Sequence, residues 1–249
     1  MTRTIIPVGP YHPLQEEPEF FRLHVEGERV ERLEIEIGYN HRGIEKICES
    51  KTFDQALFAV ERICGICSTS HPFAGVNAME DLSGIVPPER ALYARSFIGE
   101  LERIHSHLLW LGLAGHFIGY NTLWMWAWKT REPVLDIFER VTGNRQHYAM
   151  MKVGGIRRDL DNADIPWILK TLDGIKPALD IFRGALLDDP VLHARLKGVG
   201  VLTKEEIVSL GALGPTARAS GVDIDVRRDD PYAAYGRVDY NPLEGGVLP

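Results

Sequence analysis

Two of the three cysteines, Cys64 and Cys67, form a C-x-x-C pair in the stretch E-R-I-C-G-I-C-S-T-S-H-P-F, and His71 follows one helical turn later. Such a pair can close a small redox disulfide. It can also supply two thiolates to one metal ion, because residues three apart share a helix face. The pair alone is a weak signal, so the surrounding residues must decide its chemistry.

The generic alternatives fit poorly. A zinc site needs about four ligands, and beside the pair the chain offers only Cys48, His71 and scattered histidines, with no second C-x-x-C. A thioredoxin-like motif would follow a strand at a helix N-terminus, whereas a helical pattern precedes this one. What remains is a soft-metal site completed by residues outside this chain, with a purely structural pair as the alternative.

The elements that position the pair begin with a small sheet. Apolar residues alternate over residues 20–37, with Gly27 in the turn region, and this pattern predicts a β-hairpin. A polar loop over residues 38–46 follows and carries His41, Arg42 and Glu45. Residues 1–19 are rich in proline and charge and are assigned no element.

Helical periodicity begins after Thr52, a candidate N-cap, and the C-x-x-C pair lies at the end of this helix or in the turn after it. Proline inside a helix kinks it and glycine often closes one, so a later helix should be disturbed near Pro133 and end at Gly143. The further helices are predicted over residues 72–82, 89–117, 123–141, 165–186, 190–197 and 204–210.

The predicted fold class is α+β and mainly helical, with a small N-terminal antiparallel sheet followed by a bundle of long helices. Three parts are expected within one structural unit. They are the sheet and loop (residues 1–50), the helical core that carries the cysteine pair (51–210) and an irregular C-terminal extension (211–249).

Composition narrows the class of protein. With 45% hydrophobic and 25% charged residues, the 249-residue chain is typical of a globular protein. Its formal net charge of −7 argues against nucleic acid as a partner. The odd number of cysteines favours a reducing, cytoplasmic setting. We expect neither a signal peptide nor a membrane-spanning helix, although docking onto a membrane partner remains open.

Several motifs carry a family resemblance. E-R-I-C-G-I-C-S-T-S-H resembles the N-terminal cysteine motif of the nickel–iron hydrogenase large subunit. G-P-Y-H-P and G-Y-N-H-R-G-I-E-K are similar to the membrane-bound, energy-converting branch of that family. The 49-kDa-type subunit of respiratory complex I shares H-R-G-x-E-K, and further likenesses to it stand here at residues 99–107 and 139–147. The matches keep their order over nearly the whole chain.

The resemblance implies roles for the residues around the cysteines. Cys64 would be a terminal nickel ligand and Cys67 a thiolate that bridges nickel and iron. His71 would donate a hydrogen bond near the bridging sulfur and tune it. Subunits of the complex I type lack the C-x-x-C, so its presence favours a metal-carrying hydrogenase.

The family's second C-x-x-C, which supplies the other two thiolates, does not occur among the 249 residues. The chain would therefore hold half of a nickel–iron centre. A split subunit whose second chain carries the other pair, a truncated subunit and a relative that lost the metal are the three explanations. We favour a split or truncated subunit.

The resemblance also implies residues for proton and electron transfer. A glutamate before the hairpin, for which we choose Glu17 with Glu16 and Glu19 as rivals, would relay protons beside a nickel cysteine. His41, Arg42 and Glu45 would face the nearest iron–sulfur cluster of a small partner subunit. Solvated carboxylates and a salt-bridged turn are the structural alternatives.

The sequence therefore predicts the catalytic large subunit of a membrane-bound nickel–iron hydrogenase, or its N-terminal part. It would reduce protons or oxidise hydrogen and couple this to ion translocation. Its expected partners are a small iron–sulfur subunit and membrane ion-translocating subunits, on the cytoplasmic side of the cell membrane. The alternatives are a nickel-free quinone or sulfur reductase subunit and a non-catalytic scaffold.

Overall fold

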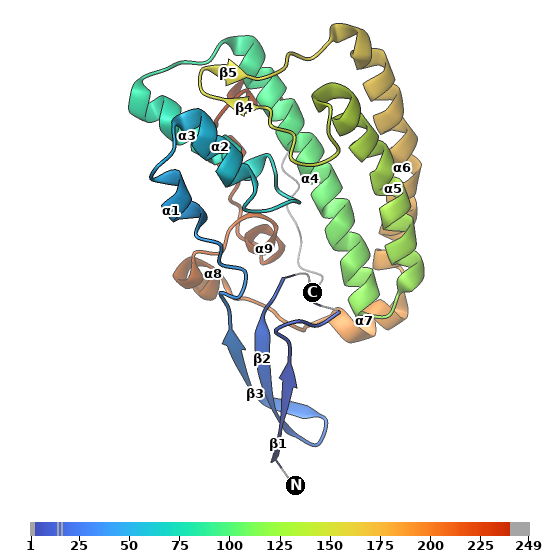
Figure 1. Ribbon diagram of the computed structural model, residues 1–249. Coiled ribbons are helices and arrows are strands. Elements are labelled where there is room, and N and C mark those ends of the chain that lie inside the picture. Colours follow the sequence, from blue (N-terminus) through green and yellow to red (C-terminus); the bar gives the residue numbers. More distant parts are fainter. Residues whose placement is uncertain (1–2, 14, 16, 240–249) are drawn as a thin grey trace. The chain divides into compact units, whose positions relative to one another are not determined.

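The structure, a computed structural model, describes residues 3–13, 15 and 17–239. The chain divides into two compact units, residues 1–52 and residues 53–249. The first contains the sheet, and the second contains the long helices (Figure 1). The cysteine pair belongs to the second unit. The predicted fold class, mainly helical with a small N-terminal antiparallel sheet, is confirmed.

The sheet of the first unit has three antiparallel strands in the order β1 (Arg3–Val8), β2 (Phe20–Glu26) and β3 (Arg29–Glu36). The predicted hairpin is therefore confirmed as β2 and β3. Strand β1 was not predicted, because Pro7 argues against a strand in a sequence. Here β1 lies at the edge of the sheet, a position that tolerates proline.

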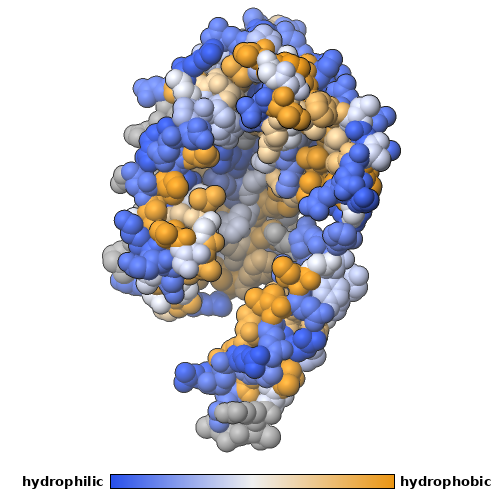
Figure 2. Space-filling model, turned by 90° about the vertical axis from the view of Figure 1, so that its left-hand side faces the viewer, coloured by the Kyte–Doolittle hydropathy of each residue, from blue (hydrophilic) through white to orange (hydrophobic). Residues whose placement is uncertain are grey.

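The two faces of this sheet differ in chemistry. On one face Phe21 is opposite Ile35 and Leu23 is opposite Leu33. On the other, charged side chains pair across the strands, as Arg22 does with Glu36 at 3.2 Å. Ile35 and Leu33 are nevertheless 59% and 46% exposed, and orange apolar side chains stand beside blue charged ones on the sheet, at the bottom of Figure 2.

Helix α1 (Ile44–Cys48) replaces the end of the loop expected over residues 38–46. Gly43 precedes it with a φ of 67°, in the left-handed region that glycine adopts without strain. His41 and Arg42 remain in the loop, whereas Glu45 lies in the first turn of the helix. The glycines of this segment predict a loop, and the helix was missed because it has only five residues.

The second unit is built from helices that agree with the predicted series within about two residues at each end, the usual uncertainty of helix boundaries. Pro133 lies inside its helix, and Gly143 ends that helix with a φ of 87° as expected. Among the described residues, no helix has the length and apolar character needed to span a bilayer. The helices are α2 (Phe53–Glu61), α3 (Ser70–Ser83), α4 (Glu89–Phe117), α5 (Asn121–Thr142), α6 (Ile165–Leu187), α7 (Pro190–Leu196) and α8 (Lys204–Leu210).

Helices α4 and α5 form an antiparallel pair at the centre of the core (Figure 1). Gly112 permits their close approach, because a Cβ atom there would lie 3.3 Å from the Cβ of Ala127. Ile98, Ile137 and Phe138 are fully buried between α4, α5 and α6. Burial of this kind contributes about 1.5–3 kcal/mol for each large apolar side chain.

A short hairpin, β4 (Met151–Lys152) and β5 (Gly155–Ile156), and the 3-10 helix η1 (Asn162–Asp164) connect α5 to α6. The tail, expected to be irregular from residue 211, instead contains short helices. They are α9 (Gly214–Ala219), α10 (Val226–Asp229) and the 3-10 helix η2 (Tyr235–Arg237). Helices this short contain too few residues to show a helical period, whereas the glycines and prolines of this segment suggest a loop. The sequence therefore predicts irregular structure here.

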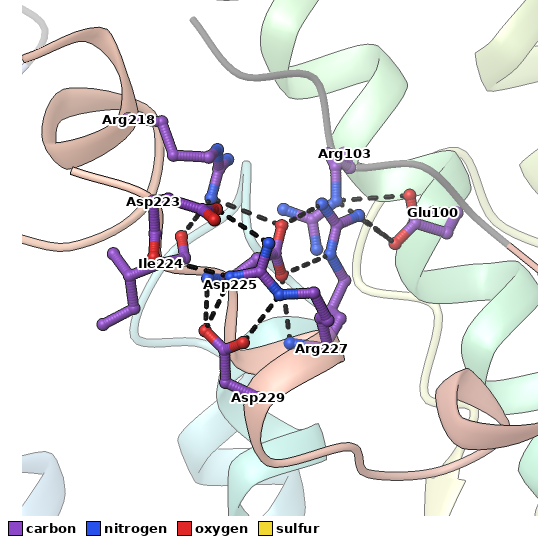
Figure 3. Close-up of polar contacts among 9 residues, drawn as sticks. Glu100, Arg103, Arg218, Asp223, Ile224, Asp225, Arg227 and Asp229 are labelled. Atoms are coloured by element: carbon purple, nitrogen blue, oxygen red, sulfur yellow. Dashed lines mark hydrogen bonds and ion pairs between the residues drawn. The ribbon is translucent and has the colours of Figure 1, made fainter. Parts of the chain in front are cut away.

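Glu100 of α4 fastens this tail to the helical core. Its carboxylate accepts hydrogen bonds from Tyr235 at 2.5 Å, Arg227 at 3.1 Å and Arg103 at 3.2 Å. Asp225 in turn accepts from Arg227 at 2.7 Å, and Figure 3 shows the cluster of alternating charges that results. Glu100 and Arg103 thus belong to a structural polar network that ties the tail to α4.

Candidate functional site

The C-x-x-C pair lies in the turn between α2 and α3, the second of the two positions expected from the sequence. Cys64 and Cys67 are both half-buried free thiols. The backbone N–H of Cys67 donates a hydrogen bond to Sγ of Cys64 at 3.4 Å. The turn therefore places the Cys64 sulfur beside the backbone of Cys67, and the two thiols are also hydrogen-bonded to each other.

The Cys67 thiol holds its proton firmly. Burial raises its pKa to about 12, and a hydrogen bond with Cys64 and the nearby Glu102 carboxylate add to the effect. A metal ion requires the thiolate, so binding at this pair must release that proton.

Glu102 of α4 fixes the end of the turn at the start of α3. Its carboxylate accepts hydrogen bonds from the backbone N–H of Thr69 and, at 2.9 Å, of Ser70. The Ser70 hydroxyl donates a third at 2.5 Å. Glu102 is only 3% exposed. It therefore caps α3 in place of a local N-cap side chain and sets a negative charge at the positive end of the helix dipole.

Residues 147–149 hold the other side of the turn. Ser68 donates to the carbonyl of Gly65 at 2.8 Å and accepts from the N–H of His147 at 3.2 Å. The buried carboxylate of Glu61 accepts from the N–H of Ala149 at 2.8 Å. His147 and Ala149 have φ values of 54° and 51°, which side chains other than glycine rarely adopt. These bonds help to maintain a strained backbone beside the cysteines.

His105, one turn after Glu102 on α4, lies fully buried behind the turn. Its Nδ1 is 3.0 Å from Nη2 of Arg131, and its Nε2 is 3.3 Å from the hydroxyl of Tyr148. A guanidinium can only donate, so Nδ1 accepts and Nε2 carries the proton. The backbone carbonyl of Ile66, between the two cysteines, also bonds to this ring. His105 thus supports the turn as a neutral imidazole.

This neutral histidine predicts a pH dependence of stability. Burial, with the Arg131 charge second, lowers the pKa of His105 from 6.5 to about 4. Between these two pH values the unfolded chain binds a proton at His105 and the folded chain does not. The free energy of unfolding therefore falls as the pH drops from about 6.5 to about 4. The full effect is about 3 kcal/mol. Denaturation measured across this range, minus the same series for His105→Asn, should show the loss, and a flat difference would contradict it.

His71 is the second residue of α3 and is partly buried. Because His71 directly follows Ser70, the contacts of Glu102 place the backbone of this histidine as well as the end of the cysteine turn. His107, which faces away from His105 along α4, is exposed.

The remaining candidates belong to the first unit. Glu17 is exposed and accepts a hydrogen bond from Asn40 at 2.9 Å, and Glu19 is partly buried, while Glu16 lies outside the described residues. His41, Arg42 and Glu45 are exposed around the start of α1. Their proposed roles in proton and electron transfer thus remain predictions.

The residues present fit a soft metal ion in part. Two adjacent thiols on one turn are suitable ligands for nickel or iron. Within the described part of the chain, however, no group of three or more His, Cys, Asp or Glu side chains could hold a metal. The turn therefore offers two ligands of a larger set.

Glu61, Glu102 and Tyr148 were missed from the sequence. Each acts through contacts with residues distant in the chain, which no local spacing reveals. For Glu102 a signal exists, because it shares the apolar face of α4 with Leu101, Ile98 and His105. An acidic residue on a buried face requires a partner, and this could have marked it.

Comparisons with known proteins place these features in context. Residues 118–245 match the family described as the 49 kDa subunit of respiratory-chain NADH dehydrogenase. Residues 42–113, which include both cysteines of the pair, match the family of nickel-dependent hydrogenases. Two parts of one chain thus match the two families that its motifs resemble.

Individual proteins match over almost the entire chain. The membrane-bound hydrogenase subunit alpha of Pyrococcus furiosus is 42% identical over 96% of this chain and 56% of its own length. The carbon monoxide-induced hydrogenase of Rhodospirillum rubrum is 38% identical over 98% of this chain and 68% of its own length. The chain therefore spans between about half and two thirds of the length of these relatives.

A solved structure confirms the fold. A chain of the membrane-bound sulfane sulfur reductase, an archaeal respiratory membrane complex, superposes with a TM-score of 0.92 at 29% identity. The match covers 98% of this chain and 65% of that chain.

Proposed function

Because the chain belongs to the superfamily of nickel-dependent hydrogenases and 49 kDa subunits of respiratory-chain NADH dehydrogenase, we propose that it is the catalytic large subunit of a membrane-bound nickel–iron hydrogenase, or the N-terminal part of one. The observation that carries this proposal is the Cys64–Cys67 turn, in which the Cys67 N–H donates to the Cys64 sulfur. Its place within residues that match the nickel-dependent hydrogenases supports it.

In this proposal Cys64 and Cys67 hold one side of a nickel–iron centre, and a second pair of thiolates comes from outside the 249 residues. The centre, when bound, supplies the metals at which protons and hydrogen interconvert. Cys64 and Cys67 would hold the metals through their thiolates, and His71 would donate a hydrogen bond near the Cys67 sulfur. Glu102 and Ser68 keep the turn in its shape.

In this proposal two groups of the chain carry protons, the Cys67 sulfur and the Glu17 carboxylate. The Cys67 sulfur carries a proton in the absence of metal, because burial raises its pKa to about 12. Glu17 would carry protons between the site and solvent through its carboxylate, which accepts from Asn40. Electrons would leave through iron–sulfur clusters of a small partner subunit, towards which His41, Arg42 and Glu45 would face. Membrane subunits would use this flow to move ions.

A second function has its own support. The superposition on a subunit of a sulfane sulfur reductase, and the match of residues 118–245 to the NADH dehydrogenase subunit, favour a reductase that acts on sulfur compounds or a quinone. Such a subunit would need no nickel. The cysteine pair is the feature that makes us prefer the hydrogenase.

Hydrogen turnover tests the proposal. The complex that contains this chain, purified anaerobically, should contain nickel and should exchange or evolve hydrogen with a reduced dye as electron donor. A nickel-free preparation that reduces a quinone or a sulfur compound but turns over no hydrogen would establish the second function instead.

A further inference from the structure

Glu102 is the only acidic side chain among the described residues that accepts hydrogen bonds from the first residues of α3, directly after the cysteine turn. It comes from α4, more than thirty residues away in the chain. Its oxygens accept from two backbone N–H groups and one hydroxyl, and the carboxylate is 3% exposed. The contact therefore joins the cysteine turn to the long core helix α4.

We propose that Glu102 is a positioning residue for metal binding by Cys64 and Cys67. Only Ser68 separates Cys67 from Thr69, so the anchored N–H groups fix the backbone that carries the Cys67 sulfur. Before the turn, Glu61 accepts a hydrogen bond from the N–H of Ala149, and after it Ser68 accepts one from the N–H of His147. With both sides anchored, the two sulfurs are presented to an ion in one arrangement, and little conformational freedom is lost on binding.

The inference rests on the proposed function only in treating the pair as metal ligands, and hydrogen activity is not needed to test it. The probe is Cd²⁺ alone, added to the reduced 249-residue chain and followed by the cadmium–thiolate charge-transfer absorbance. All proteins carry Cys48→Ser, so that the third thiol contributes nothing. Cys64→Ser should abolish the high-affinity band, and a band that survives this change would overturn the inference.

Glu102→Ala should weaken Cd²⁺ binding by about tenfold or more, because loss of a residue that orients metal ligands costs about 10–100-fold in affinity. Glu102→Gln keeps one oxygen that can accept from the N–H groups, so its affinity should lie between those of the parent and the alanine variant. This partial rescue would not follow from loss of charge alone, because both variants lose the charge, and the glutamine variant also serves if the alanine variant fails to fold.

Glu100→Ala provides the matched control. It lies on the same helix two positions away and releases the tail instead of the cysteine turn. Its Cd²⁺ affinity should equal that of the parent. Equal weakening by Glu100→Ala and Glu102→Ala would attribute the effect to general destabilisation and overturn the inference, as would an unchanged affinity in Glu102→Ala.

Discussion

Glu80→Ala should destabilise the second unit by about 3–5 kcal/mol, the usual cost of leaving one member of a buried ion pair alone. Glu80 of α3 and Arg95 of α4 pair through two hydrogen bonds of 2.6 and 2.9 Å. Their side chains are only 7% and 1% exposed. Without the carboxylate, the Arg95 charge would remain in the core without an opposing charge in this cluster.

The same pair organises the β4–β5 hairpin, which adds to the expected loss. Arg95 donates to the carbonyls of Lys152 and Gly155 at 2.9 and 2.8 Å, and Glu80 accepts from the N–H of Gly154 at 2.8 Å. An apolar replacement of both partners should therefore recover only part of the stability, because these backbone groups would lose their hydrogen bonds.

Chemical denaturation of the chain measures this loss, and Glu89→Ala is the matched control. Glu89 also pairs with an arginine, Arg237 at 3.0 Å, but its side chain is 66% exposed. Exposed pairs contribute about 0–1 kcal/mol, so this control should remain close to wild type. A loss below about 1 kcal/mol for Glu80→Ala would show that the buried ion pair contributes no more to the free energy of unfolding than an exposed pair does.

Cys64→Ser and Cys67→Ser, introduced separately into the complex, should each reduce hydrogen turnover by about a hundredfold or more. Residues that merely orient metal ligands cost about 10–100-fold, and loss of a thiolate ligand should cost at least as much. Cys48→Ser, in α1 and outside the pair, should leave turnover unchanged.

The same variants separate the two proposed reactions. A nickel-free reductase should continue to reduce a quinone or sulfur compound when both Cys64 and Cys67 are serine. Full reductase activity in that double variant, with no hydrogen activity in the parent, would exclude the hydrogenase.

The large elements were predictable because their signals are local and repeated. Helix α4 has 29 residues of helical pattern, preceded by Pro88 and begun by Glu89. Strand β1 and helix α9 were not predicted because each contains proline, which argues against a regular element. Helices α1 and α10 were not predicted because they have only five and four residues, too few to show a helical period.

The candidate site was predictable only in its ligands. The candidate ligands Cys64 and Cys67, with His71 beside them, stand close in the sequence, so spacing and family resemblance point to them as candidates. Glu61 bonds to Ala149 across 88 positions, and Tyr148 reaches His105 across 43. Such contacts arise when α4 and the segment after α5 enclose the turn, and no periodicity encodes them. The sequence indicated the chemistry, and the fold supplies the residues that hold it in place.

The central claim is that Cys64 and Cys67 bind nickel, and anomalous X-ray scattering tests it most directly. Crystals of the purified complex, measured above and below the nickel absorption edge, should show a nickel peak at bonding distance from both Sγ atoms. Two sulfurs without a nickel peak between them, or joined to each other at disulfide distance, would contradict it.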